Sequence, residues 1–379
     1  MAPGRSILHE LLGLLFHGAL LPCSSSTAET VLETPEQSIS SKWISEEESD
    51  LGYAQSLRVD YPPIASIKSD YQNIAVYNSK HYGKVLTIDD NLQITERDAS
   101  HYNEMLAHVP VMEYLSRCPN DTEPVRVMVV GGGDGYVVAE LLKHPQVRWI
   151  DHVELDEEVI NISKENLPWA DAWKDERVNL VISDGAKFVK DQAERGVNYD
   201  VIIQDSSDPF WVEVTGAIEV SPSSVLFELS YFKSLYSLLR FNGGVLLFQS
   251  ESYNFPNYLE AIGNWRGQLQ DIGFCRVRYG SISIPTYATG QIGFLVAHAG
   301  DIKENKEVSG SGDECNEDSC NALQYSMDVL PELKWNEILS RFNKMNGKTL
   351  YYHPRIHRSS YDLPLWVEEF IYGSDVSAV

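Results

Sequence analysis

The sequence is poor in basic residues. Its 379 residues include 30 Lys and Arg against 55 Asp and Glu, which gives a formal net charge of −25 and a pI of about 4.7. Nucleic acids and anionic lipids are bound by basic surfaces, so the composition argues against a nucleic acid or a membrane as a partner. An acidic cleft would attract a cationic substrate. Taken alone, however, the charge is explained more simply by solubility.

Cysteine is also scarce, with five residues in no framework spacing. This predicts a reducing compartment, and hence a cytoplasmic location. Cys315 and Cys320 lie in a stretch rich in Gly, Ser and acidic residues, Asp301 to Cys320. Because no His or further Cys is near them in the sequence, a passive surface pair is favoured over a metal site. We predict no metal ligands in the chain.

Long hydrophobic runs are missing as well. The most apolar segment, Ile7 to Ala28, is interrupted by His17 and is short for a membrane span. Ser26 and Ala28 fit the small-residue rule for a cleavage site, so a signal or transit peptide is one explanation of this segment and a disordered leader is the other.

Two hydrophobic patterns follow one another along the remaining chain. Residues Ala65 to Thr95 are rich in β-forming residues with short turns, which predicts several strands of a small antiparallel sheet. From Val125 to His298, strand and helix patterns alternate without an internal repeat. This alternation is typical of a Rossmann-like, methyltransferase-type doubly wound α/β sheet, parallel and covered by helices on both faces.

These patterns predict the domain boundaries. The chain is divided into a leader at 1–42, an N-terminal β-rich domain at 43–110, a Rossmann-like catalytic domain at 111–300, an acidic linker at 301–328 and a C-terminal helical segment at 329–379.

A glycine-rich loop, "GGGDG" from Gly131 to Gly135, ends the first strand of the predicted catalytic domain. Glycines at this place let the backbone approach a ligand at a helix N-terminus. Glu154 ends the second strand, 20 residues after Asp134, where dinucleotide folds use an acid to bind ribose hydroxyls. The third glycine of the dinucleotide fingerprint is missing, since Tyr136 stands near its place. Loop and acid together favour an adenosine-type ligand over a role in packing alone.

Acidic residues also end the third and fourth strands. Asp184 precedes a helix, so it is expected both to cap that helix and to reach an adenine amino group. Asp205 ends "YDVIIQD", and Asp208 follows three residues later. The first and fourth strands are neighbours at the switch point of a doubly wound sheet, which places both acids opposite Asp134 across one crevice. This location favours a binding site over a simple turn.

Five segments now resemble a known family, the polyamine aminopropyltransferases, and within it most the spermidine synthases. The segments are "LQITERDASHYNEMLAHVP", "VMVVGGGDGY", "VELDEEVI", "YDVIIQDSSDP" and "IPTYATGQIGF", in the order of the family. The similarity runs from about Tyr71 to Ala297 and returns weakly at Tyr351 to Phe370. It implies transfer of the aminopropyl group of decarboxylated S-adenosylmethionine to putrescine, which gives spermidine and methylthioadenosine. It also implies a homodimer or homotetramer and no cofactor beyond the co-substrate.

The resemblance assigns residues to both substrates. The donor would be held by Gln72, Asn103, Gly131, Gly133, Asp134, Glu154, Asp184, Gly185 and Pro222. The amine would be held by Tyr102, Ser206, Ser207, Asp208 and Tyr287, with Asp205 as the catalytic residue. Asn103 stands where the family often has Gln or His, so its donor contact is expected to differ.

The chemistry of the reaction agrees with this assignment. An alkylammonium ion has a pKa of about 10, so the nucleophile arrives protonated, and a carboxylate must hold it and take its proton. We expect Asp205 to be this base, with Tyr102, Asp208 and Tyr287 positioning the amine. A carboxylate at Asp134 attracts the ammonium of the decarboxylated donor and repels the carboxylate of S-adenosylmethionine, which argues against methyl transfer.

Three alternatives are kept beside the diamine reaction. They are aminopropyl transfer to a longer amine to make spermine or thermospermine, putrescine N-methylation, and polyamine binding by an inactive scaffold. The segment after Pro209, which begins with Phe210 and Trp211, is longer than in the family and is expected to form a lid over the site. It bears on the choice of amine.

Overall fold

The computed structural model describes residues 40–48, 52–117, 124–212, 218–239, 243–300 and 332–373. Nearly all of the predicted leader, the whole acidic linker and the pair Cys315 and Cys320 lie outside the described residues. In the described part, the boundary predicted between 42 and 43 falls inside a strand, β1 (Ser40–Glu48).

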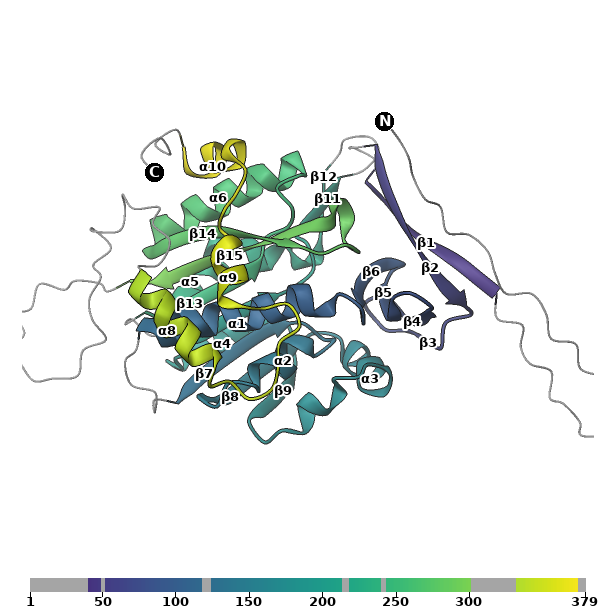
Figure 1. Ribbon diagram of the computed structural model, residues 1–379, viewed down its shortest axis with the longest axis horizontal. Coiled ribbons are helices and arrows are strands. Elements are labelled where there is room, and N and C mark those ends of the chain that lie inside the picture. The colour runs from purple at the N-terminus through teal and green to yellow at the C-terminus, as the bar shows by residue number, and fades with distance from the viewer. Residues whose placement is uncertain are drawn as a thin grey trace, which may run out of the picture. The chain divides into compact units, whose positions relative to one another are not determined.

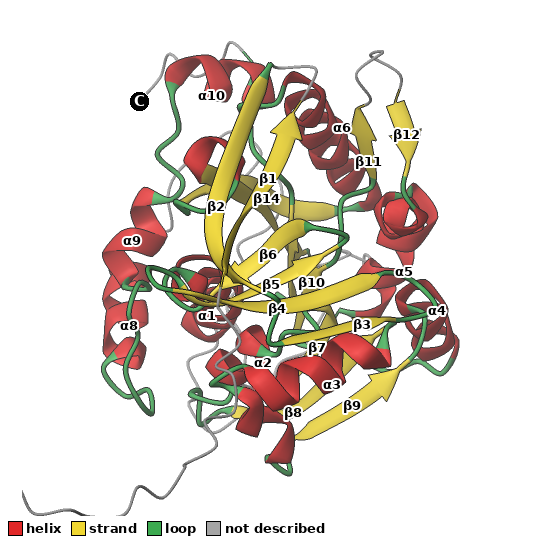
Figure 2. Cartoon of the chain, turned by 90° about the vertical axis from the view of Figure 1, so that its right-hand side faces the viewer, coloured by secondary structure: helices red, strands yellow, loops and turns green. Residues whose placement is uncertain are grey.

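The N-terminal part consists of a hairpin and a four-stranded antiparallel sheet (Figures 1 and 2). β1 pairs with β2 (Tyr53–Tyr61). The sheet follows in chain order as β3 (Ala65–Lys68), β4 (Asn73–Ser79), β5 (Gly83–Ile88) and β6 (Asn91–Thr95), as the turn signals predict.

The hairpin was not predicted from the sequence, because its first strand carries an acidic run that obscures the alternation. Ile44, Leu57 and Val59 are nevertheless buried, and they pack with Tyr77 and Val85 of the small sheet. Burial of these apolar side chains holds the hairpin against the sheet.

Helix α1 (Ala99–Arg117) leads from the small sheet into the main domain. It spans the boundary predicted at 110, and its residues Met105, Val109 and Met112 belong to the same buried core as the strands of the main sheet. The predicted boundary is therefore misplaced, because it divides a helix whose residues from Tyr102 to Leu115 pack in the core of the main sheet, while Ala99 packs in the core of the small sheet.

The main sheet has seven strands in the order β14-β15-β13-β10-β7-β8-β9. Five strands are parallel, namely β7 (Val125–Gly131), β8 (Val147–Glu154), β9 (Val178–Ile182), β10 (Val201–Asp205) and β13 (Val245–Gln249). β14 (Phe274–Ser283) and β15 (Gln291–Ala299) are antiparallel to their neighbours, which corrects the prediction of a wholly parallel sheet. The short connection between them permits a hairpin and no crossover helix.

Helices cover both faces of this sheet, as the doubly wound prediction requires (Figure 2). In β7, Val127 and Val129 face the core that α1 and α2 (Tyr136–Leu141) share, whereas Met128 and Val130 face the opposite core. That second core is built by α4 (Gly185–Glu194), α5 (Leu229–Leu238) and α6 (Pro256–Ile272).

The remaining elements are α3 (Glu157–Asn166), the 3₁₀ helices η1 (Ala170–Lys174), η2 (Pro222–Phe227) and η3 (Ala288–Gly290), and the short pair β11 (Phe210–Val212) and β12 (Ile218–Val220). η2 and α5 follow one another directly and are divided at Glu228.

The C-terminal segment is helical, as predicted, with α8 (Glu332–Phe342), α9 (Pro354–Ser359) and α10 (Leu365–Tyr372). A buried carboxylate on α1, Glu113, binds it to the main sheet. Glu113 accepts hydrogen bonds from Arg278 at 2.7 Å, His298 at 2.6 Å, His357 at 3.1 Å and Tyr361 at 2.8 Å. Burial raises the pKa of Glu113, but Arg278 and the two histidines outweigh it and hold this pKa well below the usual value. Glu113 thus connects α1, the main sheet and the C-terminal segment by hydrogen bonds to its charged carboxylate.

Cys275 in β14 is disulfide-bonded, and the other four cysteines all lie outside the described residues. This bond does not support the reducing compartment expected from cysteine spacing.

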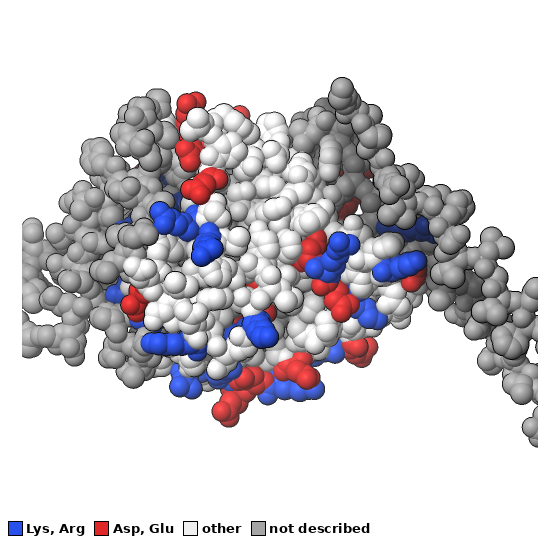
Figure 3. Space-filling view, viewed as in Figure 1, with Lys and Arg blue, Asp and Glu red and all other residues white. Residues whose placement is uncertain are grey.

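On the face seen in Figure 3, acidic and basic side chains are interspersed, mainly along the lower rim, and they surround a broad uncharged centre. None of the helices in the described part of the chain is long and apolar enough to span a membrane.

Candidate active site

The two strands that carry the predicted acids are neighbours. β10 pairs in parallel with β7, and Asp205 lies opposite Gly131 at the carboxyl ends of both. The Gly132 N–H donates to the Asp205 carbonyl at 2.8 Å. Gly131 has a φ of 81°, and a Cβ there would stand 2.1 Å from the Asp205 carbonyl oxygen. Only glycine fits here, so the loop is pressed directly against the strand end that carries Asp205.

Asp205 is held by a tyrosine from α1. The Tyr102 hydroxyl donates to Asp205 Oδ1 at 2.7 Å. Burial raises the pKa of Asp205 to about 6, although the Tyr102 hydrogen bond acts to lower it. The Tyr287 ring lies beside Tyr102, with 6.0 Å between centroids, and its hydroxyl donates to the Gln93 carbonyl at 2.7 Å. The structure therefore gathers Tyr102, Asp205 and Tyr287 from three distant parts of the chain.

Asp208 lies in a second polar group at the same edge. Gln249 Nε2 donates to Asp208 Oδ1 and to Glu251 Oε1, each at 3.0 Å. Burial raises the pKa of Asp208 to about 6. Gln249 and Glu251 were missed in the sequence, although a signal exists: they follow the apolar run of β13, the strand next to β10, where polar side chains meet the same crevice.

Two further acids stand on the donor side. Burial raises the pKa of Asp134 to about 8, and the negative charge of Asp205 is the second cause of this rise. Burial also raises the pKa of Glu154 to about 7, against hydrogen bonds from backbone N–H groups of Asp156 and Leu155. Gly133 lies against Glu154, since a Cβ at this glycine would stand 2.8 Å from Glu154 Oε2. Carboxyl groups crowded in this way are expected to bind positive charge.

The remaining predicted donor residues lie in other elements of the fold. Gln72 donates to Asp156 Oδ2 at 3.0 Å, so it joins the small sheet to the start of α3. Asp184 caps α4 by accepting from Lys187 N at 3.0 Å, and its partner in the motif, Gly185, begins that helix. Pro222 is the first residue of η2.

Asn103 and Ser206 make hydrogen bonds to neighbouring residues and none to the acids of the site among the described residues. Asn103 Nδ2 donates to the Ala99 carbonyl of its own helix at 2.8 Å, while its buried Oδ1 has no hydrogen-bond partner among the described residues. Ser206 Oγ accepts from Gln204 Nε2 at 3.2 Å, and Ser207 is exposed. The donor contact of Asn103 therefore stays a prediction, and the helix bond occupies its amide nitrogen.

Two tryptophans and a histidine support the glycine-rich loop, and none of them was predicted. Trp173 Nε1 donates to His152 Nδ1 at 3.0 Å, so the other ring nitrogen, Nε2, carries the proton and donates to the Gly131 carbonyl at 2.8 Å. Burial lowers the pKa of His152 to about 4, which keeps the ring neutral. Trp169 Nε1 donates to the Asp134 carbonyl at 2.7 Å. Hydrogen bonds from His152 and Trp169 thus hold the loop at Gly131 and at Asp134.

The segment expected to form a lid is anchored at its base. Ser221 N donates to the Pro209 carbonyl at 2.9 Å, which closes the β11–β12 pair. The Phe210 ring stacks on Tyr258 with 4.7 Å between centroids, and the Tyr258 hydroxyl donates to the Phe210 carbonyl at 2.7 Å. Residues 213–217 lie outside the described part, so closure of this segment over the site stays a prediction.

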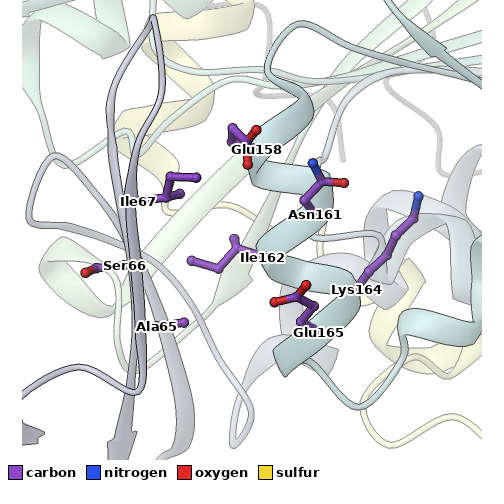
Figure 4. Close-up of a pocket in the computed structure, with 8 residues that line it drawn as sticks. All are labelled: Ala65, Ser66, Ile67, Glu158, Asn161, Ile162, Lys164 and Glu165. Atoms are coloured by element: carbon purple, nitrogen blue, oxygen red, sulfur yellow. The ribbon is translucent and has the colours of Figure 1, made fainter.

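A cavity elsewhere is separate from this chemistry. It lies between β3 and α3 and is lined by Ile67, Ile162 and polar side chains including Glu158 and Lys164 (Figure 4). None of its lining residues is a predicted site residue. Within the described ranges, no group of three or more His, Cys, Asp or Glu is arranged to hold a metal ion.

The fold and the crevice define a transferase that binds an adenosine-type donor beside a cationic acceptor. Comparison with known proteins gives the family. The spermine/spermidine synthase domain matches residues 99–306, and the spermidine synthase tetramerisation domain matches residues 42–96. The chain belongs to the spermine/spermidine synthase family and is an aminopropyltransferase of the spermidine synthase type.

Individual relatives agree with this placement. Spermidine synthase 1 of Datura stramonium is 34% identical over 84% of this chain and 89% of that protein. Spermidine synthase 2 of Arabidopsis thaliana is 39% identical over 65% of this chain and 66% of that protein, about two thirds of its length. Putrescine N-methyltransferase 4 of Nicotiana tabacum is 38% identical over 65% of this chain and 58% of that protein. The fold class, the family and the enzyme class predicted from the sequence are confirmed.

A solved structure also resembles this chain. It is a crystal structure of a spermidine synthase in complex with the transition-state analogue AdoDATO, with a TM-score of 0.66 and 25% sequence identity. The superposition covers 89% of this chain and 96% of that one. The arrangement of the small N-terminal sheet before a doubly wound domain is therefore shared with this structure.

Proposed function

We propose that this chain transfers the aminopropyl group of decarboxylated S-adenosylmethionine to putrescine, giving spermidine and methylthioadenosine. One observation carries the proposal: Asp134, Glu154, Asp205 and Asp208 stand at or just after the carboxyl ends of the neighbouring strands β7, β8 and β10, and burial raises the pKa of each. Burial disfavours the charged form of each carboxyl group in the empty protein, and for Asp134 and Glu154 the charge of Asp205 adds to this effect. A sulfonium donor and a diamine dication would stabilise the charged carboxylates when they bind.

The reaction needs three events in this crevice. Asp205 takes a proton from the ammonium of putrescine, and the freed lone pair attacks the aminopropyl carbon next to sulfur. The carbon–sulfur bond breaks, and its electrons neutralise the sulfonium as methylthioadenosine leaves. Positioning of the amine by Tyr102 and Asp208 supports the attack, because alignment of two bound reactants lowers the barrier substantially.

Asp134 supports aminopropyl transfer over methyl transfer. The Asp134 carboxylate would repel the carboxylate group of S-adenosylmethionine, and the decarboxylated donor lacks that group. Its carbonyl is fixed by Trp169, and its Oδ1 accepts from Tyr136 N at 2.8 Å, so the side chain is held in place. A methyltransferase built on this loop would need a different residue here.

The tetramerisation domain at 42–96 supports a homo-oligomer, as a homodimer or homotetramer. The intact "DSSD" and "IPTY" segments favour putrescine over longer amines. The proposal includes no cofactor, since the donor is consumed as a co-substrate.

The test uses the full chain with each nucleoside donor separately and a panel of putrescine, spermidine and other amines. Products are identified by mass. Spermidine and methylthioadenosine are expected only from decarboxylated donor with putrescine. Methylputrescine formed from S-adenosylmethionine would replace the proposal by methyl transfer, and spermine or thermospermine formed from spermidine would replace the acceptor. Binding of both substrates without any product would indicate a scaffold.

A further inference from the structure

The loop that carries Tyr287 is hydrogen-bonded to the N-terminal part of the chain at Thr286 and Tyr287. At Thr289 it is also bonded to Ser252 and Asn254 of the main domain. The residue before Tyr287, Thr286, has three backbone and side-chain polar atoms, and each is hydrogen-bonded to the N-terminal part. Thr286 N and Oγ1 donate to Asp98 Oδ2 at 3.1 and 2.8 Å. Gln55 Nε2, on β2, donates to the Thr286 carbonyl at 2.8 Å.

Tyr287 is also bonded to the N-terminal part of the chain, because its hydroxyl donates to the Gln93 carbonyl of β6. The turn is closed internally as well, since Gly290 N donates to the Tyr287 carbonyl at 2.9 Å and Ile284 N to the Gly290 carbonyl at 3.0 Å. With both its own turn and its outer contacts fixed, the loop has little freedom to move Tyr287.

Asp98 is well suited to this task. It is 3% exposed and directly precedes α1, the helix that presents Tyr102. Its Oδ1 accepts from Thr95 Oγ1 at 2.5 Å, so both carboxylate oxygens are engaged. A buried carboxylate with several donors is held in one orientation. Asp98 therefore sets Thr286, and through it Tyr287, relative to Tyr102 on the other side of the amine.

Gln55 connects the same loop to the hairpin. Its amide nitrogen also donates to Glu46 Oε2 on β1 at 2.9 Å, and Glu46 Oε1 accepts from Leu92 N. Burial raises the pKa of Glu46. The β1–β2 hairpin, which lies in the region matched by the tetramerisation domain, is in this way bonded directly to the amine side of the crevice.

We propose that Asp98 and Gln55 are positioning residues of the amine site, because they hold Thr286 and through it Tyr287. This inference rests on the proposed function, since it takes Tyr287 to contact the amine. Of the proposed donor acids, Asp134 follows β7 and Glu154 ends β8, and neither receives a hydrogen bond from Thr286 or Tyr287 among the described residues.

The test compares Thr286→Val and Gln55→Met with the wild-type full chain. Thr286→Val keeps the shape but removes one donor to Asp98, and Gln55→Met removes the bond to Thr286. Thr87→Val is the matched control: Thr87 is a buried threonine of β5 in the same domain, 1% exposed, whose hydroxyl donates to the Ala75 carbonyl. KM for amine and for donor, kcat and thermal unfolding are measured for each. Calorimetry of putrescine and methylthioadenosine measures binding without turnover.

We expect each test variant to raise KM for the amine about tenfold, as loss of one buried hydrogen bond permits, with KM for the donor changed less than twofold. The control should leave both constants unchanged. Equal changes in both constants, or no change in either, would overturn the inference, since a general loss of structure affects both substrates.

The two proposals fail in distinguishable ways. A wild-type protein that makes no spermidine, but whose putrescine affinity falls about tenfold in Thr286→Val, contradicts the proposed function and supports the inference. A protein that makes spermidine with unaltered amine constants in both variants contradicts the inference alone. No binding of putrescine to the wild type overturns both.

Discussion

The Tyr102 hydroxyl donates a 2.7 Å hydrogen bond to Asp205 Oδ1, and so joins the first turn of α1 to the end of the central strand β10. This contact links two residues that are 103 positions apart. It fixes the orientation of the carboxylate and also stabilises its charged form. The proposed base therefore depends on α1 for both its position and its pKa.

Asp205→Asn is expected to lower kcat by about 10²–10⁴-fold, which is the usual loss when a general base is removed. Binding of methylthioadenosine should be largely retained, because the donor acids are on other strands. Steady-state kinetics and calorimetry with the product nucleoside measure the two effects. Turnover within a few-fold of wild type would remove Asp205 from the role of base.

The pH dependence of the wild type tests the same residue. Because the base must be deprotonated, kcat/KM for the amine should fall as pH drops through about 6, the value to which burial raises the pKa of Asp205. Tyr102→Phe removes a hydrogen bond that lowers this pKa. The acidic limb of the variant should therefore move to higher pH. An unmoved limb would show that another group controls it.

Asp134→Asn is expected to stabilise the empty protein at alkaline pH while it weakens donor binding. The folded-state pKa of Asp134 is raised to about 8 from an ordinary value of 3.8. Between these values the native state holds a proton that the unfolded state has released, so the free energy of unfolding falls as pH rises from about 4 to 8. The variant has no carboxyl group at this position and lacks this loss, so it should be more stable than the wild type at pH 9.

Thermal unfolding of the ligand-free protein at pH 5 and pH 9 checks this sign. Asp271→Asn, at an exposed position of α6, is the control: it keeps Asp134 and should match the wild type at both pH values. The Asp134 variant should also bind S-adenosylmethionine and its decarboxylated form with more similar affinities. An unchanged affinity ratio would contradict the role of Asp134 in donor selection.

Glu113→Gln should lower the free energy of unfolding by about 3–5 kcal/mol, because it leaves the Arg278 guanidinium buried without its counter-charge. The lowered pKa of Glu113 adds a pH dependence: its contribution is present above the ordinary value of 4.5 and is lost as pH falls through the lower folded-state value. Denaturant unfolding measures the change. Glu369→Gln, an exposed residue of α10, should alter stability by no more than about 0.5 kcal/mol.

The sequence predicted the local elements well, because hydrophobic periodicity is local. The four strands over Ala65–Thr95, the strand-helix order from Val125 and the acids that end the strands follow from spacing alone. It did not predict the β1–β2 hairpin, since the acidic run Glu46–Glu48 in β1 obscures the alternation of apolar positions. The direction of β14 and β15 was also missed, because an apolar strand pattern is the same in parallel and antiparallel pairs.

The same division applies to the site. The residues Asp134, Asp205 and Asp208 could be found from the sequence, since each follows an apolar strand and the carboxyl ends of neighbouring parallel strands share one crevice. Only the tertiary structure brings Gln249 beside Asp208 and Gln55 onto Thr286, a contact across 231 positions. Sequence spacing carries the periodicity of each element, whereas such contacts arise only when packing of the cores closes distant segments against one another.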